Sequence, residues 1–127
     1  MASHNVHDKT GVSDREAKAY KDALMAHAKA AHNRVCADCP KTGPTWCSVN
    51  LGVFICMDCA GGHRNLGVHL SKVRSLSLDT MTPPQFRFLK AMDNVRANSY
   101  WEKNMPADYV KTETNRASTL KIGRAHV

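Results

Sequence analysis

The sequence predicts an α+β fold: a small zinc-stapled domain in which a short central β-sheet with a four-cysteine finger is flanked by helices. Three observations lead to this prediction. Four cysteines stand in two close pairs in the first half of the chain. Short β-prone runs lie between and after these pairs, and segments with helical periodicity precede and follow them. A chain of 127 residues forms one domain, whose modest core benefits from a bound metal.

The two cysteine pairs carry the strongest signal. Cys36 and Cys39 are followed by Cys56 and Cys59 in the pattern C-x2-C-x16-C-x2-C. Two intervening residues let both sulfurs of a pair face one ion, and two pairs complete the tetrahedral four-sulfur site that Zn²⁺ accepts. The alternatives are disulfides, which need an oxidising compartment, or a redox-active C-x-x-C. Because nothing in the sequence suggests an oxidising compartment, one zinc ion is the favoured interpretation.

The first predicted element is a helix. Residues 1–12 lack periodicity and are expected to be disordered. Ser13 and Glu16 then form the pattern of a capping box at a helix start, and Asn33 is the expected end of the helix. Apolar residues at three- and four-residue steps give it one packing face: Ala17, Tyr20, Leu24, Ala28 and Ala31.

The middle of the chain predicts the sheet and a short helix. Residues 45–49 and 53–55 are β-prone runs between the two cysteine pairs. Residues 57–66 are predicted to form a short helix that Gly67 ends, since glycine suits the backbone just after a helix C-terminus. Residues 73–78 alternate well enough between apolar and polar side chains for a third strand.

Two further helices are predicted after the sheet. Thr82 and the two prolines after it are typical of a helix N-terminus. A last helical stretch is expected over residues 97–103. The helix after Thr82 has an apolar face at helical spacing: Phe86, Leu89, Met92 and Val95.

The end of the chain has the pattern of a non-native segment. Ile-Gly-Arg-Ala-His-Val at residues 122–127 can be back-translated into a widely used sequencing adapter, whose leading bases also fit the end of the Lys121 codon. Our hypothesis is that residues 121–127 derive from this adapter and that the native gene continues. The domain, residues 13–120, would then be truncated at its C-terminus.

The composition narrows the kinds of partner. The formal net charge is +7, which suits nucleic acid, an anionic membrane or an acidic protein without choosing among them. The basic residues are scattered, which argues against a dedicated nucleic-acid arm. No apolar run reaches membrane-spanning length, and the polar start is unlike a signal peptide. A soluble intracellular protein is therefore expected, with Cys47, the fifth cysteine, as a small buried residue.

A more specific motif surrounds the second cysteine pair. Arg64 follows Cys59 at the spacing C-x4-R, residues 66–75 read L-G-V-H-L-S-K-V-R-S, and residues 94–102 contain N-x3-N-x2-W-E. This combination resembles the zinc-finger domain of Arf GTPase-activating proteins (ArfGAP), most closely the small membrane-trafficking members of that family. The resemblance covers about residues 24–110.

The resemblance implies a GTPase-activating protein for Arf-family small GTPases in vesicle trafficking, not itself an enzyme, with Arg64 as an arginine finger supplied in trans. The zinc would be structural, because four sulfurs leave no open position for water. The implied partner is GTP-bound Arf, with indirect membrane contact through Arf and no nucleic acid. The implied location is the cytoplasm, with recruitment to Golgi or endosomal membranes. Trp46, Lys72 and Arg74 are weaker candidates for partner binding, and His63 is expected to pack beside the zinc site.

The sequence also departs from the family pattern and leaves alternatives open. Met81 stands where the family usually has tryptophan, the family's closing helix is absent, and Gly62 replaces an aliphatic residue. Glycine in a helix is about 1 kcal/mol less favourable than alanine, so Gly62 is expected to make the helix that carries Arg64 less rigid. A DNA-binding module of the GATA type has nearly the same cysteine spacing, but residues 60–64 are too glycine-rich for a base-reading helix. A zinc-stapled module that binds a GTPase without accelerating it is the other alternative.

Overall fold

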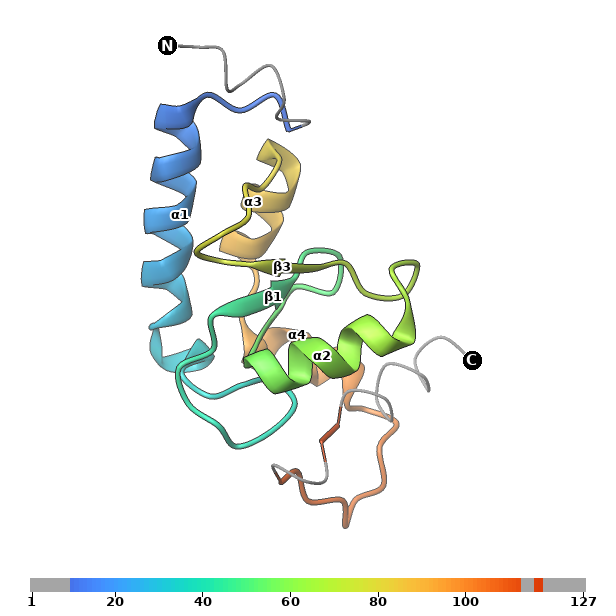
Figure 1. The fold of residues 1–127 in the computed structure, drawn as a ribbon. Coiled ribbons are helices and arrows are strands. Elements are labelled where there is room, and N and C mark those ends of the chain that lie inside the picture. Colours follow the sequence, from blue (N-terminus) through green and yellow to red (C-terminus); the bar gives the residue numbers. More distant parts are fainter. Residues whose placement is uncertain (1–9, 113–115, 118–127) are drawn as a thin grey trace.

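The computed structural model describes residues 10–112 and 116–117, and these form helices around one small sheet (Figure 1). The α+β fold class is thereby confirmed. The predicted adapter-derived tail, residues 121–127, lies outside the described residues, as do residues 1–9. No helix within the described part of the chain has the length and apolar character needed to cross a bilayer. In chain order the elements are α1 (Asp14–Ala28), η2 (Ala31–Asn33), β1 (Trp46–Ser48), β2 (Val53–Ile55), α2 (Met57–Leu66), β3 (Val73–Ser75), α3 (Pro83–Ala91) and α4 (Asn94–Trp101).

The sheet is antiparallel, with the strand order β2-β1-β3. Cys47 at the centre of β1 lies opposite Phe54 on one side and Arg74 on the other. β3 is shorter than the predicted residues 73–78, because the chain turns after Ser75. The Ser75 amide donates to Asp79 Oδ2 at 2.7 Å, and this side-chain contact closes the turn.

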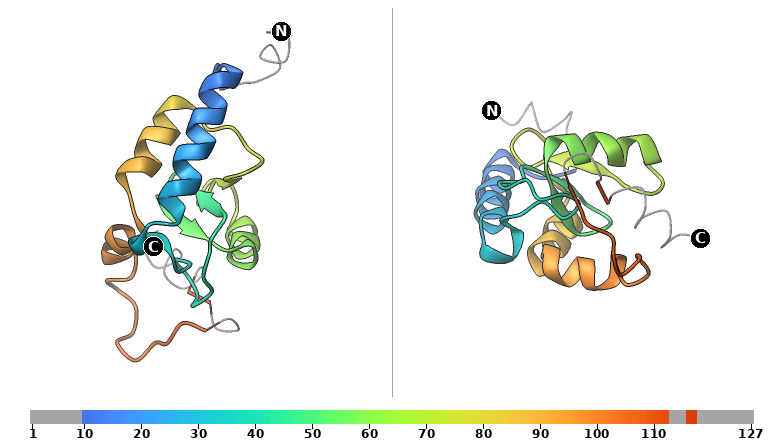
Figure 2. Two further views of the ribbon diagram at one scale, coloured as in Figure 1. Left: turned by 90° about the vertical axis from the view of Figure 1, so that its left-hand side faces the viewer. Right: turned by 90° about the horizontal axis from the view of Figure 1, so that it is seen from below.

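The sheet lies between two groups of helices, with α1 and α3 on one side and α2 and α4 on the other (Figure 1; Figure 2, left). Side chains alternate along β2, so Val53 and Ile55 face one core cluster while Phe54 faces the other. The first cluster includes Ala60 of α2 and Ala97 of α4. The second cluster combines residues of α1 and α3 with the other face of the sheet: Leu24, Ala28, Cys47, Val49, Phe54, Leu76, Met81 and Leu89. Met81, which departs from the family pattern, is thus a core residue.

The start of α1 agrees with the sequence and its end does not. Ser13 and Glu16 form the predicted capping box, with the Glu16 amide donating to Ser13 Oγ at 3.2 Å. The helix ends at Ala28, so the prediction that it continues to Asn33 was wrong. Asn33 instead is buried in η2, where its Oδ1 accepts a 2.7 Å hydrogen bond from the Asn94 amide. Asn33 therefore ends the short 3-10 helix η2 and not α1, and its side chain joins the first and last parts of the fold.

The predicted helix through Val95 is also two helices. α3 ends at Ala91, Met92 is extended, and Asp93 caps α4 by accepting from the Arg96 amide. Val95 therefore belongs to α4, where it is exposed. This break between α3 and α4 places Asn94 against β2, which is an edge strand of the sheet.

The Asn94 carboxamide replaces a missing neighbour strand. Its Oδ1 accepts from the Phe54 amide at 2.7 Å, and its Nδ2 donates to the Phe54 carbonyl at 2.9 Å. Buried backbone groups of an edge strand need such partners. Asn94 thereby fixes α4 to the sheet.

Candidate functional site

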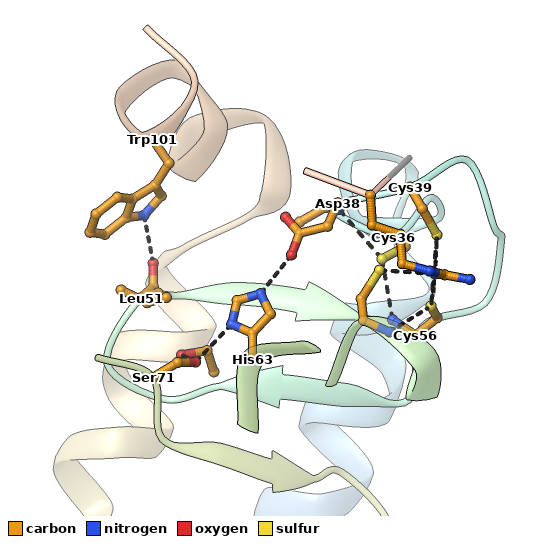
Figure 3. A network of polar contacts seen from close by, with 12 residues as sticks. Cys36, Asp38, Cys39, Leu51, Cys56, His63, Ser71 and Trp101 are labelled. Carbon is orange, nitrogen blue, oxygen red and sulfur yellow. Dashed lines mark hydrogen bonds and ion pairs between the residues drawn. The ribbon is translucent and has the colours of Figure 1, made fainter. Parts of the chain in front are cut away.

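The four cysteines of the two pairs meet in one buried cluster (Figure 3). Their sulfur atoms all lie within 4.8 Å of one another. Cys36 and Cys39 come from the loop between η2 and β1. Cys56 is the N-cap of α2, and Cys59 lies in its first turn. The structure therefore positions the four predicted ligands around a single point, as binding of one metal ion requires.

Backbone amides point at these sulfurs. The Asp38 and Cys56 amides donate to Cys36 Sγ at 3.4 and 3.3 Å, and the Cys59 amide donates to Cys56 Sγ at 3.4 Å. Hydrogen bonds from the Cys59 thiol and from the Asp38 and Cys56 amides lower the pKa of Cys36, against the opposing effect of burial. Four buried sulfurs with amide donors fit a soft divalent cation.

His63 of α2 belongs to a separate buried network (Figure 3). Its Nε2–H donates to Asp38 Oδ2 at 2.5 Å, and its Nδ1 lies 2.8 Å from Ser71 Oγ. Ser71 in turn donates to Ser48 Oγ at 2.8 Å. Asp38 stands between the first two cysteines, so the network joins that loop to α2 and to the end of β1. Both ring nitrogens are engaged, and His63 is therefore not a metal ligand.

Arg64 follows His63 on the exposed side of α2. Its guanidinium carbon lies 4.6 Å from the centroid of the Trp46 ring, within cation–π range. Trp46 is the first residue of β1 and is partly buried. Among the residues that the structure describes, no acidic side chain forms an ion pair with Arg64. One face of the guanidinium thus packs on an aromatic ring, and its N–H groups can still bind an anion.

A shallow groove of about 190 Å³ runs beside Arg64, and its lining includes Arg74 of β3 and Val68. Val68 is exposed. Lys72 is also exposed but does not line this groove. Of the three weaker candidates, Trp46 contacts Arg64 and Arg74 lines the same groove, whereas Lys72 is not among the residues that line it.

Cys47 and Gly62 are two further positions near the site, and neither presents a functional group to it. Cys47 is fully buried, and this burial raises the pKa of its thiol to about 12, so the thiol stays protonated at neutral pH. α2 runs without interruption through Gly62 to Leu66. The helix that carries Arg64 therefore forms despite the glycine.

Arg116 was not predicted to take part in the site. Its Nη1 lies within hydrogen-bonding distance of three of the four sulfurs, at 3.2 Å from Cys39, 3.4 Å from Cys56 and 3.1 Å from Cys59. The contact with Cys59 raises the pKa of Arg116 above its usual value. Nothing in the local sequence marks this arginine, which is 57 residues from Cys59. Asp38 and Ser71 were missed for the same reason, since only the fold brings them to His63.

Comparison with known proteins gives one consistent family. The family model described as "Putative GTPase activating protein for Arf" matches residues 21–125. The chain is 45% identical over 107 residues to the probable ADP-ribosylation factor GTPase-activating protein AGD15 of Arabidopsis thaliana, covering 84% of this chain and 46% of that protein. It is 48% identical over 85 residues to mouse (Mus musculus) stromal membrane-associated protein 1, covering 67% of this chain and 19% of that protein. The chain thus spans less than half the length of both relatives.

Solved structures show the same fold. A structure titled as a putative GTPase activating protein for ADP ribosylation factor from Cryptosporidium parvum matches with a TM-score of 0.73 and 31% identity, covering 90% of this chain and 93% of that one. The ArfGap domain of HIV-1 Rev binding protein matches with a TM-score of 0.69 at 22% identity, covering 89% and 96%. The second likeness concerns the fold alone.

Proposed function

This chain belongs to the family of GTPase-activating proteins for Arf, and from that premise we propose that it accelerates GTP hydrolysis by an Arf-family small GTPase through Arg64. One observation carries the proposal. The exposed guanidinium of Arg64 rests on the Trp46 ring, on a helix whose first turn supplies two of the four clustered sulfurs. This placement supports a role in which the arginine reaches into a partner's active site.

The chemistry explains why an arginine is needed. During hydrolysis negative charge spreads over the transferring phosphoryl group, and a small GTPase alone neutralises it poorly. A guanidinium offers a permanent charge and a planar fork of donors that matches phosphate oxygens. Arg64 would supply both in trans to GTP-bound Arf. The protein would therefore be an activator of the GTPase and hold no complete active site of its own.

The metal in this proposal is one zinc ion with a structural role. When bound, zinc would crosslink the loop of Cys36 and Cys39 to the start of α2, and four sulfurs would leave no position for a reacting water. The chain's own residues complete the attachment, since His63 ties α2 to Asp38 in the same loop. Arg64 directly follows His63, so the orientation of its side chain depends on both links.

Trp46 and the basic residues have supporting roles in the proposal. Stacking on Trp46 restricts the Arg64 side chain before the partner arrives, which lowers the ordering cost on binding. Arg74 at the groove and Lys72 beside β3 would attract an acidic face of Arf and raise the association rate in a salt-dependent way. Since Arf would hold the complex at a membrane, we place the protein in the cytoplasm, with recruitment to Golgi or endosomal membranes in vesicle trafficking. No nucleic acid is needed for this role.

The test is single-turnover hydrolysis of GTP by myristoylated Arf on vesicles, with and without the zinc-loaded chain. Acceleration that saturates with the chain's concentration is expected. Binding of GTP-loaded Arf without acceleration would instead favour an interaction module that lacks activating function.

A further inference from the structure

We propose that Arg116 is a guanidinium cap on the metal site, which neutralises the sulfur ligands and slows the release of the bound ion. The inference rests on the proposed structural zinc, and it concerns how this chain retains the metal. It assigns a role to a residue outside both cysteine pairs and far from them in sequence.

The contacts of Arg116 span both cysteine pairs. Nη1 lies 3.2 Å from Cys39 Sγ in the first pair and 3.1 Å from Cys59 Sγ in the second. Nη2 lies 3.4 Å from Asp58 Oδ2 in the first turn of α2. One guanidinium therefore bridges the loop of the first pair and the helix of the second.

The charge of the site gives these contacts their importance. Four thiolates and one divalent cation carry a formal charge of −2, and a buried charge is unfavourable unless it is paired and hydrogen-bonded. The amide donors described above reach Cys36 and Cys56. Arg116 adds donors to Cys39 and Cys59, and its own charge offsets half of the formal excess. The side chain is 22% exposed, so water screens this attraction only in part.

The backbone around Arg116 is built into the fold. The amide of the next residue, Ala117, donates to the Asp38 carbonyl at 2.9 Å, and Ala117 is fully buried. The Arg116 carbonyl accepts from the Tyr109 hydroxyl at 3.0 Å. These contacts hold the guanidinium over the sulfurs, which distinguishes it from a freely moving surface arginine.

The guanidinium cap should control how fast the metal leaves. Residues that hydrogen-bond metal ligands typically change metal affinity by roughly 10–100-fold when they are replaced. A donor on a thiolate also lowers its reactivity toward oxidants and competing ligands. Loss of the Arg116 side chain should thus speed zinc release while the four ligands remain in place.

The experiment uses the full chain loaded with zinc, and it begins with elemental analysis. Zinc transfer to excess 4-(2-pyridylazo)resorcinol is then followed for the wild type, Arg116→Met and Lys111→Met. Lys111 is the matched control, because its Nζ donates to the Ala37 carbonyl at 3.2 Å and pairs with Glu102 at 2.7 Å. It ties the same C-terminal segment to the same loop but donates to the backbone and a carboxylate.

Arg116→Met should release zinc about 10–100-fold faster than the wild type, and Lys111→Met should stay within about threefold of it. Equal rates for the wild type and Arg116→Met would overturn the inference. Equal acceleration by the two variants would also overturn it, because the attachment of the segment would then account for the effect. If Arg116→Met does not fold, Arg116→Lys, which keeps the charge and loses the fork, should fold and release zinc at an intermediate rate; a wild-type rate for it would contradict the cap.

Cobalt substitution supplies a readout that does not depend on rates. The thiolate-to-cobalt absorption bands should shift in Arg116→Met and keep their wild-type position in Lys111→Met. Identical spectra for all three proteins would contradict a direct contact between guanidinium and sulfur. A wild-type chain that binds no zinc would refute the proposed structural metal, an outcome that elemental analysis separates from failure of the cap.

Discussion

The guanidinium of Arg64 and the indole of Trp46 form one cation–π contact, with 4.6 Å from the guanidinium carbon to the ring centroid. Arg64 belongs to α2 and Trp46 to β1, and the two residues are 18 positions apart in the sequence. Ordering a long side chain on binding costs roughly 0.5–1.5 kcal/mol, and stacking in the free protein removes part of that cost. Arg64 and Trp46 are therefore expected to act as a unit.

Arg64→Lys should abolish most of the activation of GTP hydrolysis. An arginine finger accelerates hydrolysis by about 10³–10⁵, and lysine keeps the charge but lacks the planar fork that reaches two oxygens. The measurement is the single-turnover rate constant on GTP-loaded Arf at saturating activator. Zinc content and the circular dichroism spectrum should match the wild type, because Arg64 is exposed. Equal rate constants for the two proteins would show that Arg64 is not the finger.

Trp46→Leu should lower the same rate constant by about 2–30-fold, which corresponds to a cation–π contact of about 0.5–2 kcal/mol. Trp46→Phe keeps an aromatic ring, so its rate constant should lie between those of the wild type and Trp46→Leu. Trp101→Phe is the matched control, since the Trp101 indole donates to the Leu51 carbonyl at 3.2 Å and belongs to α4. If Trp46 only fills the core, its replacement should reduce the free energy of unfolding and leave the saturated rate constant unchanged.

Arg74→Ala should weaken association with Arf without changing the rate constant at saturation. Arg74 lines the groove beside Arg64, and a charge at the rim of an interface acts mainly through the association rate. The loss should shrink as salt is raised, because screening weakens the attraction in the wild type as well. A fall in the saturated rate constant would instead give Arg74 a direct part in the reaction.

Cys36→Ser should lose zinc and unfold at least the region of the two cysteine pairs, whereas Cys47→Ala should keep both zinc and fold. Structural zinc contributes roughly 10 kcal/mol or more at neutral pH, beyond the net stability of many domains. Burial holds the pKa of the Cys47 thiol at about 12, so this thiol should also resist alkylation at pH 8 in the folded protein. Elemental analysis and thiol labelling measure both outcomes, and equal damage from the two substitutions would contradict the assignment.

Local signals in the sequence predicted much of the fold. The strand at residues 53–55 and the helix at residues 57–66 have the predicted bounds, because glycine and the cysteine spacing mark their ends. The capping box at Ser13 and that at Thr82 depend on residues three positions apart. Motif spacing likewise identified the four clustered sulfurs.

Contacts between distant residues account for what the sequence did not predict. Asn33 was predicted to end a helix, yet its side chain bonds the Asn94 amide 61 positions away. The break before α4 follows from the same requirement, since Asn94 must reach the backbone of Phe54. Arg116 likewise contacts Cys59 across 57 positions of sequence. Periodicity and spacing carry no information about such pairs.

The buried pair of His63 and Asp38 should stabilise the domain more than any exposed pair in it. Both side chains are fully buried, with 2.5 Å between His63 Nε2 and Asp38 Oδ2. Removal of either partner deprives the other of this one hydrogen bond in the core. Such a loss costs roughly 2–4 kcal/mol, so His63→Gln should lower the free energy of unfolding by about that amount in the presence of zinc. His69, exposed three residues beyond the end of α2, is the matched control, and His69→Ala should stay within about 0.5 kcal/mol of the wild type.

A double-mutant cycle with Asp38→Asn separates the pair from general effects of substitution. Contacting buried residues show coupling of about 0.5–3 kcal/mol, and a value in the upper half of that range is expected here. Since His63 precedes Arg64 on α2, His63→Gln should also lower the saturated rate constant of GTP hydrolysis more than it weakens Arf binding. Additive effects of the two substitutions on unfolding would show that the histidine only fills space. A folded, zinc-loaded His63→Gln protein with the wild-type rate constant would show that Arg64 keeps its orientation without this link.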